Sequence, residues 1–153
     1  MALASSGCDR SRVRKTDGAS LSQYHRMAVL AFTDPRGKGP AIADAITAGL
    51  PQLMYEQADN AKVAAILKAY KPDPETGISL EAFERIRLDT GADAIAMGRM
   101  APDWSGLRLD IVETETGEPV LRAALTPRGQ HRRAFETPDE VAAEVLRVLA
   151  DRR

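Results

Sequence analysis

The sequence predicts one α/β domain with a mixed sheet of four to five strands flanked by helices. Two observations lead to this class. Residues 26–32 (RMAVLAF) and 94–98 (AIAMG) are short segments with apolar residues on both faces, as in strands that helices cover on both sides. Four other stretches repeat apolar residues at helical spacing. The expected order is β-α-(β)-α-α-β-β-β-α, and a chain of 153 residues fits a single core.

The first helix is expected over residues 41–54 (AIADAITAGLPQLM), after the loop TDPRGKGP. Pro51 should bend or end it, because proline cannot continue the hydrogen bonds of a helix interior. Leu53 and Met54 then belong either to a last turn or to a short edge strand that runs into MYEQ. The sequence leaves this boundary open.

Two further helices have recognisable ends. The helix AKVAAILKAY can be capped by Asp59 or Asn60, whose side chains accept hydrogen bonds from free backbone N–H groups. The helix LEAFERIRLDT has Ser79 as its N-cap and Gly91 as its C-terminal stop. Both are amphipathic, which indicates that they pack on the sheet.

The second half of the chain is predicted to be mainly β. A helical crossover from 26–32 to AIAMG implies that these two strands are parallel. The strands LRLDIV and PVLRAALT form a β-hairpin, and Arg108 and Asp110 alternate with leucines so that one of its faces is wetter. The last helix begins with Thr137 and Glu140, which match the N-cap and N3 positions of a capping box.

Composition argues against several functions. The net charge is −1, so the chain lacks the basic excess of a nucleic-acid binder. No apolar run approaches the roughly 20 residues that span a bilayer. One cysteine and two histidines offer neither a disulfide nor a His/Cys metal cluster, and His25 and His131 lie in polar segments unlike those of tuned catalytic groups. We therefore expect no catalytic residue, metal or cofactor.

A tryptophan and a cluster of arginines are the candidate protein-binding residues. Trp104, in the turn APDWSG, either contacts a partner or folds down over the end of the sheet. Arg132 and Arg133, together with Arg128 and His131, form either a partner-facing patch or a solvated loop.

An alternative function rests on the loop FTDPRGKGPAIAD. Arg36 and Lys38 lie near a helix N-terminus, where backbone N–H groups favour anions. Gly37 and Gly39 match neither a Walker A loop nor a dinucleotide loop. The alternative is therefore a soluble α/β protein that binds a nucleotide or another anionic small molecule at Arg36–Gly39.

The N-terminus contains the lone cysteine, Cys8. The stretch ALASSGC is similar to a bacterial lipobox, in which the last cysteine receives lipid, although Ser5 stands where that pattern has leucine. The other interpretation is an unmodified cysteine in a polar tail. We expect residues 1–25 to be a signal remnant with its lipidation site and a flexible leader, and residues 26–153 to be the domain.

The leader carries a short basic run from Arg10 to Lys15. Its polar residues show neither helical nor strand periodicity, so no regular structure is expected there. The run is either a solvated tail or a segment that lies near anionic lipid head groups.

The domain resembles the CsgG/LpoB/FlgO group of bacterial envelope lipoprotein domains, which is related to the N-terminal domain of TolB. The resemblance rests on RMAVLAF, AIADAITAGL, TGADAIAMGRM and LRLDIVETETGEPVLRA, in this order. A Gly-Ala-Asp turn precedes the strand and a Thr-Gly turn closes the hairpin, matched here by residues 91–93 and by Thr116 and Gly117. Glu56-Gln57 stands where the group often has a Glu-Arg pair, and the chain has no room for the membrane-inserting strands of a CsgG-like pore.

The resemblance implies a non-enzymatic periplasmic domain that is lipid-anchored to the inner or outer membrane. It would act by binding and supporting another cell-envelope protein, as a peptidoglycan synthase activator or as an accessory of a secretion or flagellar assembly. The implied partners are that protein, the membrane through a lipid on Cys8, and further copies of the chain.

Overall fold

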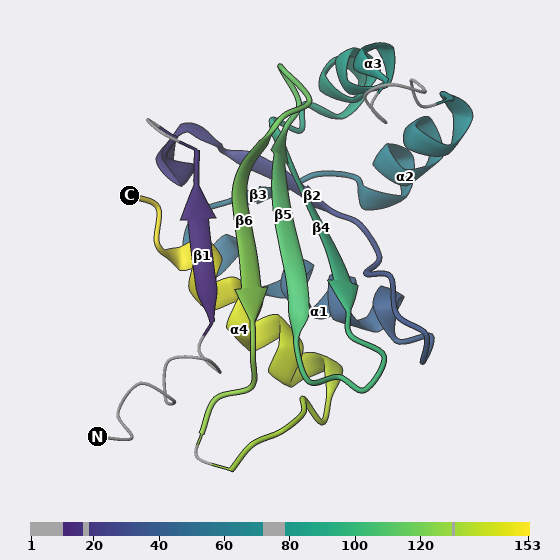
Figure 1. Cartoon of the computed structure of the whole chain (residues 1–153). Coiled ribbons are helices and arrows are strands. Elements are labelled where there is room, and N and C mark those ends of the chain that lie inside the picture. The colour runs from purple at the N-terminus through teal and green to yellow at the C-terminus, as the bar shows by residue number, and fades with distance from the viewer. Residues whose placement is uncertain (1–10, 17–18, 72–78, 130) are drawn as a thin grey trace.

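The computed structural model describes residues 11–16, 19–71, 79–129 and 131–153. A six-stranded sheet in the order β1-β6-β5-β4-β2-β3 forms its centre, with helices on both faces (Figure 1). The strands are β1 (Arg12–Lys15), β2 (Arg26–Val29), β3 (Glu56–Gln57), β4 (Ala94–Met100), β5 (Leu107–Glu113) and β6 (Pro119–Leu125). The helices are α1 (Gly39–Gly49), α2 (Asn60–Ala69), α3 (Leu80–Thr90) and α4 (Pro138–Ala150), with short 3-10 helices at Leu21–Gln23 and Pro51–Leu53.

The predicted α/β class and mixed sheet are confirmed. Strand β2 pairs in parallel with β3 and β4, and β4, β5 and β6 follow as antiparallel neighbours. The short edge strand that the sequence left open is β3, which pairs with Arg26 and Met27. Leu53 ends a 3-10 turn and Met54 adopts a left-handed conformation with φ 68°, so neither residue belongs to α1 or to β3.

Helices α1 and α4 cover one face of the sheet. Alternate strand residues point into this layer, because successive side chains of a strand lie on opposite faces. Val141, Val145 and Leu149 of α4 are fully buried against them, as the predicted amphipathic stripe requires. The strand residues of this core are Met27, Val29, Ala94, Ala96, Met100, Leu107, Leu109, Ile111, Leu121, Ala123 and Leu125.

Helices α2 and α3 cover only part of the opposite face. They pack on Ala28 of β2, Ile95 of β4 and Val112 of β5. Further along β4 on the same face, Met97 is half-buried and Arg99 is exposed. In Figure 1 these two helices lie over one end of the sheet, and the rest of β4, β5, β6 and β1 faces the viewer uncovered. This uncovered half positions the candidate site.

The helix ends follow from local side-chain hydrogen bonds. Asp59, Ser79 and Thr137 each accept a hydrogen bond from a backbone N–H of the first turn that follows. Gly91 ends α3 in a left-handed conformation with φ 73°, as predicted. Within the described ranges, no helix combines the length and the apolar character that crossing a bilayer requires.

The prediction of an unstructured leader is wrong for its described part. Residues Arg12–Lys15 form β1, an antiparallel edge strand on β6, which raises the strand count to six. Ser22 N–H donates to the carbonyl oxygen of Arg152 at 2.9 Å, so the following segment is bound to the C-terminus. The sequence does not reveal β1, because an edge strand of four residues, three of them exposed, shows no apolar alternation.

Candidate binding surface on the open half of the sheet

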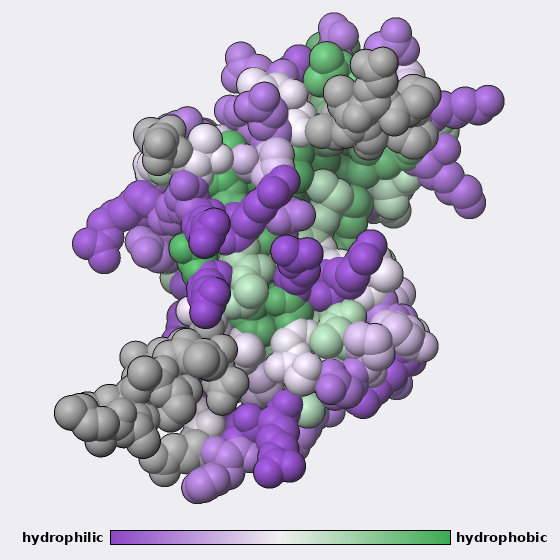
Figure 2. Space-filling model, in the orientation of Figure 1, coloured by the Kyte–Doolittle hydropathy of each residue, from purple (hydrophilic) through white to green (hydrophobic). Residues whose placement is uncertain are grey.

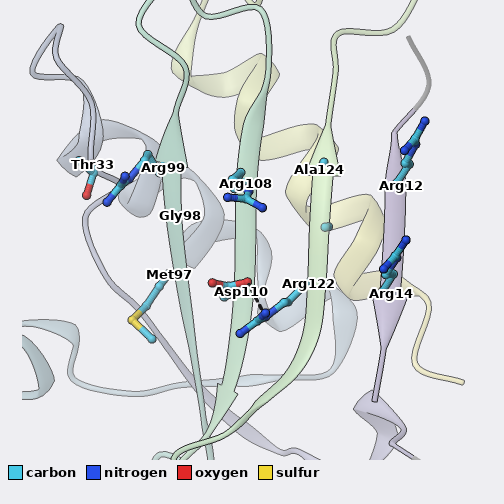
Figure 3. Close-up of a pocket in the computed structure, with 11 residues that line it drawn as sticks. Arg12, Arg14, Thr33, Met97, Gly98, Arg99, Arg108, Asp110, Arg122 and Ala124 are labelled. Carbon is cyan, nitrogen blue, oxygen red and sulfur yellow. Dashed lines mark ion pairs between the residues drawn. The ribbon is translucent and has the colours of Figure 1, made fainter. Parts of the chain in front are cut away.

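The uncovered half of the sheet carries a groove with a volume of about 710 Å³ (Figure 3). Its lining comes mostly from β1, β4, β5 and β6. We call it the arginine groove, after the charged residues that line it: Arg12, Arg14, Arg99, Arg108 and Arg122, with Asp110.

Strand register arranges these side chains in two rows across the sheet. One row runs from Arg99 through Arg108 and Ala124 to Arg12. The next row, two residues along each strand, consists of Met97, Asp110, Arg122 and Arg14. Figure 3 shows both rows on the same side of the sheet. Residues far apart in the sequence, from β1 to β6, therefore form one surface.

The apolar pattern of the strands fixes the outward direction of the arginines. In β5, Leu107 and Leu109 are buried under α4 and its neighbours, so Arg108 between them must point to the other face. In β6, Leu121 and Ala123 are buried in the same way, which turns Arg122 outward. A shift of the register by one residue would bury these charges, so burial of the leucines holds the groove in place.

The groove is strongly positive. Its five arginines and one aspartate give a net charge of +4, whereas the whole chain has −1, so the remaining residues carry −5. Arg122 Nε lies 3.8 Å from Asp110 Oδ1. Among the residues that the structure describes, Arg12, Arg14, Arg99 and Arg108 form no salt bridge. Four guanidinium groups are thus available to a ligand.

The floor between the arginines is less polar. Met97, Gly98 and Ala124 line it. Figure 2 shows a hollow across the middle of this face, with hydrophilic side chains around a more hydrophobic floor. An ion pair formed in such a hollow is less screened by water than one on a flat surface.

Trp104 does not lie on the surface. The side chain is 2% exposed, and its indole Nε1–H donates to Asp34 Oδ1 at 2.9 Å. The Arg36 guanidinium lies over the indole, 5.2 Å from its centroid. The prediction of Trp104 as a partner contact is therefore wrong for this structure, because Trp104 folds down over the end of the sheet, the other role that the sequence allowed.

In the loop with Arg36 and Lys38, the backbone N–H groups already bind a carboxylate of the same loop. Asp34 accepts hydrogen bonds from the backbone N–H groups of Arg36 at 3.2 Å and Lys38 at 2.9 Å. Burial alone would raise the pKa of Asp34, but the hydrogen bonds from Trp104 and from these two amides lower it below its usual value of 3.8. An incoming anion would have to displace this carboxylate, so the geometry does not favour the alternative small-molecule site.

Arg132 and Arg133 lie in the loop before α4, outside the arginine groove. The Arg132 guanidinium pairs with Glu140 and, at 3.9 Å, with Glu136. Glu140 also accepts a hydrogen bond from the backbone N–H of Glu136, so Arg132 is part of the N-terminal cap of α4. Arg133 is exposed. Both remain predictions as partner contacts.

Cys8 lies outside the described residues, so its lipidation remains a prediction. Within the described part of the chain, no group of His, Cys, Asp and Glu side chains could hold a metal ion.

Sequence reasoning missed the arginine groove. The alternation of Arg108 and Asp110 with leucines marked a wetter hairpin face, and the spacing of Arg12 and Arg14 by two residues matches a strand with one charged face. Only the strand order β1-β6-β5-β4 brings the charged residues of β1 and of the hairpin together with Arg99.

The dodecamer of a single-residue variant of PelC from Paraburkholderia phytofirmans is among the solved structures with a similar fold. Its TM-score is 0.57 at 16% sequence identity, and the match covers 94% of this chain and 99% of PelC. The PelC dodecamer without that substitution gives 0.54 at 17% identity with the same coverage. The fold resembles that of PelC. At this identity the similarity concerns the fold alone.

Two other solved structures have a lower similarity. Lipoprotein GNA1162 from Neisseria meningitidis has a TM-score of 0.47 at 13% identity, with 82% of this chain and 96% of that chain covered. LpoB from E. coli has 0.43 at 11% identity, with 70% and 64% covered. Both TM-scores are below 0.5. No protein-family model matches the sequence, and no curated protein does.

Proposed function

We propose that this chain is a non-enzymatic domain of a bacterial lipoprotein, held at a membrane in the periplasm, and that it binds another cell-envelope protein through the arginine groove. The observation that carries this proposal is the groove itself: Arg12, Arg14, Arg99 and Arg108 are exposed in it without a carboxylate partner among the described residues. The fold shared with PelC and the sequence resemblance to envelope lipoprotein domains support the setting.

The chemistry of the groove suits a protein partner with carboxylates. Guanidinium groups bind carboxylates with two parallel hydrogen bonds, and Arg is enriched among the residues that dominate protein interfaces. Met97 and Ala124 offer apolar contact between the charges. PelC is a dodecamer, which supports self-association as one form that protein binding by this fold takes.

The proposed anchor lies close to the groove in the sequence. Cys8 precedes Arg12, the first residue of β1, by four residues, which span at most about 14 Å when extended. A lipid on Cys8 would therefore hold β1, and with it one side of the groove, near the membrane surface. A single acyl chain binds a membrane weakly, so a lipoprotein anchor depends on several chains or on additional contacts.

Site-specific photo-cross-linking in the native host tests the binding surface. A photoreactive residue at Ala124, in the first row of the groove, should give a cross-linked protein that mass spectrometry identifies as an envelope component. The same residue at Asp44, exposed on α1 on the opposite side of the sheet, is the matched control. Equal cross-linking from both positions, or none from position 124, would contradict the proposal.

The anchor is tested separately by the intact mass of the chain from the host's membrane fraction. A mature chain that begins at a lipid-modified Cys8, and a Cys8→Ser chain that leaves the membrane fraction, are the expected results. An unmodified chain in the soluble fraction would remove the membrane part of the proposal and leave the groove unaffected.

A further inference from the structure

We infer that the protein that occupies the arginine groove is a second copy of this chain, which inserts the acidic tip of its β5–β6 hairpin. This inference rests on the proposed function and names the partner of the same surface. It follows from two complementary features of one molecule, a concave positive groove and a protruding negative tip.

The hairpin tip is acidic and well defined. Glu113, Glu115 and Glu118 lie within six residues around the turn at Thr116 and Gly117. The Gly117 N–H donates to the Glu113 carbonyl oxygen at 2.8 Å, and Gly117 has φ 74°, a conformation that glycine adopts without strain. In Figure 1 this turn extends beyond the end of the sheet.

Two of these carboxylates have no positive partner within the described residues. Glu115 and Glu118 are exposed and form no salt bridge there. Glu113 differs, because it accepts a hydrogen bond from Thr116 and lies beside Tyr24. Glu115 and Glu118 are therefore the carboxylates that an arginine of another molecule can reach.

The tip cannot reach the groove of its own chain. The arginines at positions 108 and 122 project from the same two strands whose ends form the tip. Because paired strands are stiff, the tip stays at a fixed distance from them and points away from the groove along the strand direction. Contact between the two features thus requires two copies.

Such a contact is heterologous, since a groove on one copy meets a tip on the next. Each copy then keeps one free groove or one free tip, so the contact repeats until a ring closes or a filament forms. The contact brings opposite charges together, because the groove has a net charge of +4 and the tip carries three glutamates.

The shape of the groove disfavours a flat partner. Its floor lies in the hollow that Figure 2 shows, beside the layer formed by α2 and α3, so a lipid bilayer would meet the rim before the floor. A narrow turn such as residues 115–118 fits a hollow better than a planar surface does. A separate acidic protein remains as an outcome of the test.

The test is sedimentation velocity of the full-length chain at rising concentration, in low salt and again in high salt. We expect the wild-type chain to self-associate in low salt and to dissociate as salt screens the ion pairs. The groove variant Arg99→Glu/Arg108→Glu and the tip variant Glu115→Lys/Glu118→Lys should each weaken association at least tenfold. Circular dichroism and thermal unfolding of each variant check that the fold is retained.

A mixture of the two variants gives the decisive reading. The carboxylates introduced into the groove of one variant then face the lysines introduced at the tip of the other, and the remaining groove and tip keep their original charges, so association should return. Glu81→Lys/Glu84→Lys, on the exposed face of α3, is the matched charge control and should leave association unchanged.

The outcomes separate this inference from the proposed function. A wild-type chain that stays monomeric at all concentrations, or a mixture that fails to associate, overturns the inference. If the groove variant still removes a cross-link from position 124 to a different envelope protein, the proposed function stands and its partner is that protein. If the groove variant leaves every cross-link unchanged, the proposed function is wrong as well.

Discussion

Arg99 and Arg108 lie directly opposite each other in the antiparallel pair of β4 and β5, on the open face of the sheet. Like charges at directly opposed strand positions destabilise a sheet. No described carboxylate pairs with either guanidinium, so the fold gains nothing from this arrangement. The pair is best understood as part of a surface that is completed by an acidic partner.

Replacement of Arg108 by threonine should raise the free energy of unfolding by about 0.2–1 kcal/mol, because it removes the like-charge pair and introduces a residue that favours strands. Urea unfolding at low ionic strength measures the change, which should shrink at high salt. Arg12→Thr is the control, since Arg12 lies opposite the uncharged Ala124 and its loss removes no directly opposed like charge, so it should stabilise the sheet less. A destabilised Arg108→Thr chain would contradict this account.

Removal of the Asp34 side chain should destabilise the fold by about 1–3 kcal/mol, because Asp34→Ala leaves the buried indole N–H of Trp104 without its acceptor. Trp104 is the single tryptophan, so its fluorescence follows unfolding directly. A variant as stable as the wild type would show that the hydrogen bond from Trp104 to Asp34 does not hold the loop.

The lowered pKa of Asp34 predicts that the stability of the fold depends on pH. Its pKa is lowered in the folded chain, so the carboxylate contributes stability above pH of about 4, and this contribution is lost as the pH falls through the folded pKa. Asp34→Asn should remove this part of the acid sensitivity. Urea unfolding of both chains at pH 7 and pH 3, followed by Trp104 fluorescence, measures it; equal acid sensitivity in both chains would be the contrary result.

Gly39 and Gly37 should respond differently to substitution by alanine. A Cβ at Gly39 would lie 1.9 Å from the backbone oxygen of Phe32, so Gly39→Ala should cost about 3 kcal/mol or more as α1 shifts away. Gly37 has φ 74° and open space around it, so Gly37→Ala should cost about 1 kcal/mol. Similar losses for both variants would show that α1 is not held closely against Phe32.

Tyr24 predicts a loss of stability in alkali. Burial of its ring, reinforced by Glu113, raises the pKa of Tyr24 to about 12. The unfolded chain releases this proton near pH 10, so the folded state binds it more tightly and its stability falls between pH 10 and pH 12. Burial also raises the pKa of Tyr55, so ultraviolet titration should show a late component from both tyrosines. Tyr24→Phe should reduce this late component, and a late component that Tyr24→Phe leaves unchanged would contradict the burial of Tyr24 beside Glu113.

The elements that the sequence predicted correctly are those with local determinants. The caps at Ser79 and Thr137 and the stop at Gly91 depend on hydrogen bonds within a few residues, and each lies where it was expected. The hairpin of β5 and β6 and the parallel pairing of β2 with β4 follow equally from patterns within the chain.

The candidate site could not be predicted in the same way, because it depends on which strands are neighbours. Arg12 and Arg14 belong to an edge strand whose charged residues resemble a tail, and only its pairing with β6 brings them beside Arg122. The prediction of Trp104 as a partner contact is wrong for a related reason, since its burial depends on a hydrogen bond to Asp34, 70 residues earlier in the chain.

The measurement that tests the central claim most directly is the photo-cross-link from position 124 in the native host, compared between the wild-type background and Arg99→Glu/Arg108→Glu. Our account predicts one dominant cross-linked protein that disappears when the two arginines are reversed and persists when Arg147, an exposed arginine of α4 on the other face of the sheet, is changed to glutamate. A cross-link that survives reversal of Arg99 and Arg108, or that is lost equally with Arg147→Glu, would contradict the assignment of the arginine groove as the binding surface.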